Sequence, residues 1–108
     1  MFSRQERLPR AQFPIALKEG RRFFSPHFVM VVPENVRGYA VVLPNKVIRL
    51  SSARHRLARR VLMALRILPL PPAIIVFPRS SASSVNYRDI KTELGKLLST
   101  IRTTSIYP

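Results

Sequence analysis

The chain has 108 residues, enough for one domain with a single modest core. Its 19 Lys and Arg against 5 Asp and Glu give a formal net charge of +14, and most of these cations are arginine. Such a charge opposes compaction unless a polyanion neutralises it, yet a hydrophobic content of 46% argues against a disordered basic tail. The absence of cysteine excludes disulfides, thiolate zinc sites and thiol catalysis.

Nothing in the sequence predicts a membrane segment. The longest apolar run, residues 67–77, is interrupted by prolines and is too short to cross a bilayer. The first ten residues, MFSRQERLPR, lack the apolar core of a signal peptide. We therefore expect a cytoplasmic protein whose partners are nucleic acids and not membranes.

The N-terminal part of the chain predicts a basic arm followed by a short helix. Residues 1–9 are basic and carry a proline, which is typical of an arm. Residues 10–20 predict a helix that begins near Phe13, because Pro14 costs little in a first turn. Gly20 is the expected stop of this helix.

Strands are predicted next. Residues 23–26 fit a short edge strand with a proline at its margin. Residues 27–32 and 38–43 read as strands on either side of a Pro-Glu-Asn turn, and we expect them to pair as a hairpin. Alternation in the second of these strands places Tyr39, Val41 and Leu43 on one face.

Residues 51–68 predict an amphipathic helix. At about 100° per residue, the apolar side chains share one arc and the polar side chains share the opposite one. Ser51 or Ser52 can cap its start, and the prolines from residue 69 onward end it. The apolar arc holds Leu57, Val61, Ala64, Leu65 and Leu68, and the polar arc holds His55, Arg56, Arg59, Arg60 and Arg66.

The cations of this helix have no acidic counterpart nearby, because no Asp or Glu occurs between Glu34 and Asp89. A solvated basic face explains the helix taken alone equally well, but the arginine fork is suited to phosphate. Arg54 differs from the other arginines: it projects beside the apolar arc, so we expect it at the rim of the packing surface. The predicted RNA-binding residues are Lys46, Arg49, Arg54, His55, Arg56, Arg59, Arg60 and Arg66.

The last third predicts a buried strand and a helix. Residues 73–77 are continuously apolar and β-branched, as in a central strand. The serine-rich stretch 80–84 is expected to be a flexible loop, and residues 86–102 carry apolar residues at helical spacing. The strand at 38–43, the helix and the strand at 73–77 form a βαβ unit, so the order of elements predicts an α+β sandwich.

No catalytic centre is predicted. The acids are scattered, and Asp89 and Glu93, four residues apart on one helix, are expected to pair with neighbouring cations. His27 and His55 have no carboxylate close in sequence. Several aromatic residues before residue 40 alternate with arginines, a combination that can stack unpaired bases beside a basic groove, although most such rings belong to a core.

Taken together, these segments resemble the protein subunit of bacterial ribonuclease P over roughly residues 7–102. The sequence Arg54-His55-Arg56-Leu57-Ala58-Arg59 is similar to the family signature Arg-Asn-Arg-x-Lys-Arg, and Arg66 matches the arginine at the helix end. The opening helix with its trailing glycine, the strands and the last helix follow in the family's order. The chain departs from the family at His55, Ala58, Leu62-Met63, Ala73 and Ala40.

The resemblance implies a two-layer αβββαβα sandwich with a left-handed βαβ crossover. It also implies a protein that assists a catalytic RNA in removing the 5′ leader of precursor tRNA, with Mg²⁺ held through the RNA subunit. The signature helix would face that RNA, and a cleft between the sheet and the first helix would take the single-stranded leader. We expect the cleft to be lined by Phe13, Leu17, Phe28 or Met30, and Tyr39 or Val41.

Three other functions remain compatible with the residues. A structural RNA-binding module of the ribosomal-protein type shares the charge and the layout. A stand-alone nuclease would cut RNA without an RNA subunit. A basic amphipathic membrane binder is disfavoured, because the arginine helix is expected to bury its apolar arc on the sheet.

Overall fold

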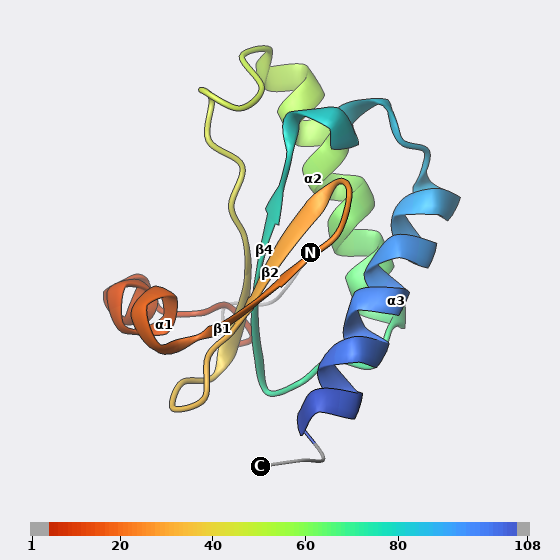
Figure 1. Cartoon of the computed structure of the whole chain (residues 1–108). Helices are drawn as coiled ribbons and strands as arrows, with labels where there is room; N and C mark the ends of the chain where they lie inside the picture. Colours follow the sequence, from red (N-terminus) through yellow and green to blue (C-terminus); the bar gives the residue numbers. More distant parts are fainter. Residues whose placement is uncertain (1–4, 106–108) are drawn as a thin grey trace.

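The computed structural model describes residues 5–105. It contains three α-helices, two short 3-10 helices and a four-stranded sheet, in the predicted order αβββαβα (Figure 1). The elements are η1 (Arg10–Gln12), α1 (Phe13–Glu19), β1 (Arg21–Phe24), β2 (Phe28–Val32), β3 (Gly38–Val41), α2 (Ser51–Ile67), β4 (Ala73–Pro78), η2 (Ser80–Ser84) and α3 (Tyr87–Ser105).

The strands lie in the order β1-β2-β4-β3. The predicted hairpin between β2 and β3 is wrong, because β4 lies between them, antiparallel to β2 and parallel to β3. The reason is burial: Ala73, Ile74, Ile75 and Val76 of β4 are at most 1% exposed, so both faces and both edges of this strand need cover. The parallel pair joined by α2 confirms the βαβ unit. β1 lies at the sheet edge as predicted, but it begins two residues earlier than expected and ends before Ser25.

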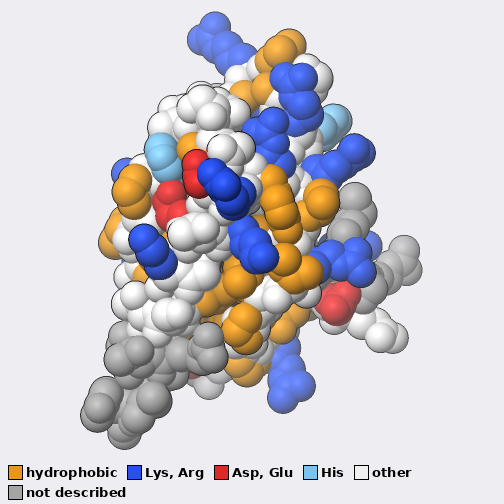
Figure 2. All heavy atoms as spheres, turned by 90° about the vertical axis from the view of Figure 1, so that its right-hand side faces the viewer, with side chains coloured by type: hydrophobic (Ala, Val, Ile, Leu, Met, Phe, Trp, Pro, Cys, Tyr) orange, Lys and Arg blue, Asp and Glu red, His pale blue; other side chains and the backbone are white. Residues whose placement is uncertain are grey.

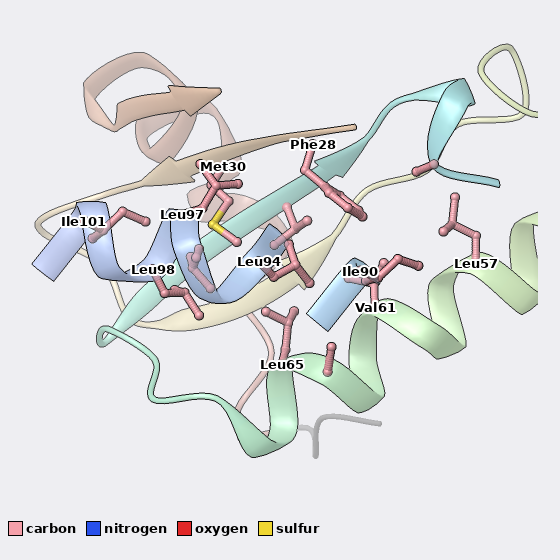
Figure 3. Packing of buried hydrophobic residues seen from close by; sticks show 14 residues of the cluster. Phe28, Met30, Leu57, Val61, Leu65, Ile90, Leu94, Leu97, Leu98 and Ile101 are labelled. Atoms are coloured by element: carbon pink, nitrogen blue, oxygen red, sulfur yellow. The ribbon is translucent and has the colours of Figure 1, made fainter. Parts of the chain in front are cut away.

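The main core lies between the sheet and the layer of α2 and α3 (Figure 1). Figure 3 shows Phe28 and Met30 of β2 pointing into this core, toward the apolar side chains of both helices. Tyr39, Val41 and Leu43 pack against the same cluster, as their alternation predicts. The helices contribute Leu57, Val61, Ala64 and Leu65 from α2 and Ile90, Leu94, Leu97, Leu98 and Ile101 from α3.

The short helix α1 covers part of the opposite face of the sheet (Figure 1). Its buried residue Ala16 joins Val31 of β2 and Ile75 of β4 in a second, smaller cluster. As predicted, α1 begins at Phe13 with a proline in its first turn and ends before Gly20. The two clusters follow from strand alternation, because successive side chains of one strand point to opposite faces.

The start of α2 differs from the prediction. Its N-terminal cap is Leu50 and not a serine, and no side chain bonds to the free amides there. Leu50 is extended (ψ 117°) and its carbonyl accepts from the Arg54 amide at 3.0 Å, so both serines already lie inside the helix. A serine capping bond is therefore absent from the described start of α2.

The N-terminal segment is not a free arm where the structure describes it, and residues 1–4 of the predicted arm lie outside the described residues. Arg7 forms a parallel bridge with Tyr39 at the open edge of β3. The Leu8 amide donates to the Tyr39 carbonyl at 3.0 Å, and the Tyr39 amide donates to the Glu6 carbonyl at 2.8 Å. Leu8 is only 6% exposed, so burial of one apolar side chain explains why this segment docks.

Gly38 is the position that makes this docking possible. Its φ is +127°, and a Cβ there would lie 2.6 Å from the Cα and the amide nitrogen of Leu8. We expect Gly38→Ala to cost about 1–3 kcal/mol through backbone strain alone, lowering the melting temperature by on the order of 10 °C. Gly95→Ala is the control in a thermal unfolding experiment, because a Cβ at Gly95 makes an ordinary contact at 3.7 Å with Leu68. Equal melting temperatures for the two variants would contradict this role of Gly38.

The serine-rich stretch 80–84 is a 3-10 helix and not a flexible loop. Its Ala82 is fully buried in the main core, which fixes the turn between β4 and α3. His27 adds a second attachment, because its Nδ1 lies 2.8 Å from the Ser81 hydroxyl oxygen. Helices of the described chain are all too short or too polar to cross a membrane.

Candidate nucleic-acid interface

The outer face of α2 presents cations to solvent. His55, Arg56, Arg59 and Arg66 are exposed, as the polar arc predicts. None of the three arginines makes a hydrogen bond or an ion pair within the described part of the chain. Figure 2 shows Lys and Arg side chains spread over the side of the molecule formed by α2 and α3. Guanidinium groups without an internal partner are free to bind phosphate.

Two arginines of α2 instead hold the protein's own backbone. Arg54 lies half-buried at the helix start, and its Nη1 donates to the carbonyls of Ile48 at 2.9 Å and Arg49 at 2.8 Å. Arg60 is also half-buried, and its Nη1 donates to the carbonyls of Ser83 at 3.4 Å and Val85 at 3.3 Å. Arg54 therefore steadies the link before α2, while Arg60 attaches η2 to the helix.

These bonds predict that the arginines of α2 fall into two groups. Arg54→Ala and Arg60→Ala should each lower the free energy of unfolding by about 1 kcal/mol, because partly exposed charged hydrogen bonds are lost. Arg56→Ala removes an exposed side chain and should leave the free energy of unfolding within about 0.5 kcal/mol of the wild-type value. Denaturant unfolding of the three variants measures the difference, and equal stabilities would mean that the carbonyl bonds do not contribute.

Lys46 and Arg49 lie exposed in the link between β3 and α2. The Arg49 carbonyl is one of the two that Arg54 binds, so this link is fixed against the start of the helix. Both predicted cations of the link therefore lie just before the helix start, and with the arginines of α2 they form one basic segment of the sequence.

A pocket of about 460 Å³ opens at the edge of the sheet formed by β3. Phe13 belongs to the cluster under α1, whereas Tyr39 packs on the main core, so the pocket lies where the two faces of the sheet meet. The N-terminal segment, β3 and α2 form its walls. Its lining consists of Arg7, Leu8, Arg10, Phe13, Tyr39, Ala40, Val41, Ala58 and Leu62.

The structure brings together only part of the predicted leader cleft. Phe13, Tyr39 and the alternative residue Val41 line the pocket, while Leu17 packs into the cluster between α1 and the sheet. Phe28 was placed on the wrong face: it is 0% exposed in the main core, on the side of the sheet away from α1. Met30 shares that face and is also 0% exposed, because residues two apart in a strand point the same way.

Six pocket residues were not predicted from the sequence: Arg7, Leu8, Arg10, Ala40, Ala58 and Leu62. Arg7 and Leu8 belong to the predicted arm, and Arg10 begins the segment predicted as the first helix. The apolar Leu8 is the signal that the arm docks. Ala58 and Leu62 lie four apart on α2, a spacing that places them on one side of the helix. Both positions depart from the family pattern, Ala58 within the signature and Leu62 after it, but the sequence does not show that they form a wall.

One acidic residue, Glu93, serves the fold. Glu93 is half-buried, and its carboxylate accepts from the Ser25 hydroxyl and, at 2.8 Å, from the His27 amide. It thereby ties α3 to the turn between β1 and β2, which differs from the predicted pairing with neighbouring cations. Within residues 5–105, no three His, Asp or Glu side chains lie close enough to hold a metal ion.

The chain is similar to proteins of one kind in sequence and in structure. The family model described as Ribonuclease P matches residues 2–102. The ribonuclease P protein of Thermotoga maritima is 28% identical with a TM-score of 0.70, and 86% of this chain and 94% of that chain are covered. No curated protein matches the chain by sequence.

Ribonuclease P proteins of Staphylococcus aureus share the fold at lower identity. One, a mutant with defective mRNA degradation activity, is 18% identical with a TM-score of 0.77, covering 91% of this chain and 89% of that chain. Another is also 18% identical, with a TM-score of 0.67 and coverage of 93% and 92%. The family model matches nearly the whole sequence, and the α+β fold and the basic face of α2 agree with it. The chain therefore belongs to the ribonuclease P family as a divergent protein subunit.

Proposed function

We propose that this protein assists the RNA subunit of ribonuclease P in removing the 5′ leader from precursor tRNA. In this proposal the RNA subunit holds Mg²⁺ and cleaves the phosphodiester bond, and the protein binds both RNAs. The exposed arginines of α2, with Lys46 and Arg49, bind the catalytic RNA. The pocket at the β3 edge receives a nucleotide of the single-stranded leader.

One observation carries the proposal: α2 serves both surfaces. Arg56 and Arg59 are exposed on this helix, and Ala58 and Leu62 of the same helix form a wall of the pocket. An RNA bound along α2 would therefore hold its substrate within reach of Phe13, the ring contributed by α1. Arg7 and Arg10 at the pocket supply positive charge for the leader backbone.

The pocket has the chemistry of a single-strand site. Unpaired bases stack on aromatic rings at about 1–3 kcal/mol per base, beside cations that follow the backbone. Phe13 and Tyr39 offer two rings in one pocket, and Ala40 and Ala58 keep the space between the walls open. A leader is single-stranded whereas the mature 5′ end of tRNA lacks it, so such a pocket would favour the precursor.

Reconstitution tests the proposal. The protein would be mixed with the ribonuclease P RNA encoded by the same genome, and cleavage of precursor tRNA would be followed at low Mg²⁺. We expect faster cleavage at the mature 5′ end with both subunits, and no cleavage by the protein alone. Cleavage by the protein alone would indicate a stand-alone nuclease. RNA binding without any effect on cleavage would indicate a structural RNA-binding module.

A further inference from the structure

Two large apolar side chains are exposed next to each other on α2. Met63 is 52% exposed and Ile67 is 58% exposed, and they lie four residues apart, which places them side by side on the helix surface. The other exposed large apolar residues of the described chain are single ones in α1, β1 and the link before α2. Single exposed apolar residues are ordinary, whereas contiguous apolar surface with a polar rim is typical of interaction sites.

Packing of the domain does not explain this pair. α2 packs on the core through Leu57, Val61, Ala64 and Leu65, and the main cluster includes neither Met63 nor Ile67. A polar side chain at either exposed position would cost no core contact. The two residues therefore keep apolar surface in water on the side of α2 that also carries the free arginines.

The surroundings of the pair determine what can cover it. Arg59 lies four residues before Met63 and Arg66 three residues after it, and both arginines are exposed. From Arg59 to Ile67 the row spans about 12 Å along the helix axis. No acidic residue occurs in α2, so the occupant must present negative charge around an apolar surface.

RNA with an unpaired base meets both requirements. Its phosphates match the arginines, and the face of an unpaired base is flat and weakly polar. Sequence-specific RNA recognition uses such bases, which contact apolar side chains and guanidinium planes. A methionine sulfur also makes favourable contacts with aromatic rings. Figure 2 shows apolar side chains emerging among Lys and Arg on this side of the molecule.

We propose that Met63 and Ile67 cover an unpaired base of the ribonuclease P RNA, while Arg59 and Arg66 bind the phosphates beside that base. The inference rests on the proposed function, because it names what the outer face of α2 recognises in the catalytic RNA. Part of the affinity is then independent of salt, since contact between apolar surfaces releases no counter-ions.

A salt titration separates the two kinds of contact. Binding of the catalytic RNA would be measured at several salt concentrations for the wild type, for Met63→Ser with Ile67→Ser, and for Arg59→Gln with Arg66→Gln. We expect the serine pair to lose about tenfold in affinity at every salt concentration with an unchanged slope. The glutamine pair should flatten the slope by about 1.4–1.8 on a log–log plot, for two lost contacts.

A fully paired RNA duplex serves as the second ligand. On the duplex the serine pair should bind as the wild type does, because no unpaired base is available to it. Wild-type binding of the catalytic RNA by the serine pair would overturn the inference and leave the proposed function standing. An equal loss of affinity for both RNAs would overturn the inference too. So would a wild-type dimer that becomes monomeric in the serine pair, because this face of α2 would then join two copies of the chain. Failure of the wild type to bind the catalytic RNA would instead refute the proposed function, and the inference with it.

Discussion

Replacing Arg56, Arg59 and Arg66 together by Gln should weaken binding of the ribonuclease P RNA about a hundredfold at about 0.15 M salt. The size follows from counter-ion release, because each lost phosphate contact reduces the slope of log K against log salt by about 0.7–0.9. The slope should therefore fall by about 2–3 in a filter-binding titration. These side chains are exposed and hold no carbonyl of the described chain, so the melting temperature should not change.

The matched control lies on the neighbouring helix. Arg88, Lys91 and Lys96 of α3 are exposed, and replacing them by Gln lowers the net charge by the same three units. If α2 is the RNA-binding face, the α3 variant should lose far less affinity and keep most of its slope. Equal losses would show that binding follows net charge and not the position of the arginines.

Sequence periodicity predicts the helices and strands of this fold better than it predicts which strands lie side by side in the sheet. The helix around Phe13, the helix at 51–68 and the strand at 73–77 each carry a local pattern, and each forms as predicted. Strand order has no local signal. The turn at 33–35 suggests a hairpin, but β4 buries nearly all its side chains and so takes the place beside β2. Long-range burial overrides the short connection.

The candidate site shows the same division between local and distant information. The exposed arginines of α2 follow from a helical projection, whereas the roles of Arg54 and Arg60 depend on carbonyls five or more residues away in the sequence. Phe28 was misplaced because a strand with apolar residues on both faces does not show which face meets which helix. Leu8 indicates that the N-terminal segment docks, but neither Leu8 nor Ala58 indicates a pocket, since the pocket forms only after this segment pairs with β3.

Phe13→Ala should reduce the preference of the holoenzyme for precursor over mature tRNA by about 5- to 150-fold, the loss of about 1–3 kcal/mol of stacking on one base. Affinity for both tRNAs would be measured with the RNA subunit present, beside a thermal unfolding curve of the protein. Phe24→Ala is the aromatic control, because Phe24 is 63% exposed on β1 and does not line this pocket. It should leave the preference unchanged.

Phe13 also packs against the smaller apolar cluster, so its truncation will lower stability to some degree. Ala58→Leu separates the two effects, because it fills the pocket from α2 while every aromatic ring stays in place. If the pocket takes a leader nucleotide, this variant should also reduce the preference for precursor tRNA, with little change in melting temperature. A different result would contradict this role of the pocket: Ala58→Leu keeps the wild-type preference, while Phe13→Ala lowers the melting temperature and weakens binding of both tRNAs equally. Phe13 would then act through the core, and the leader would bind elsewhere.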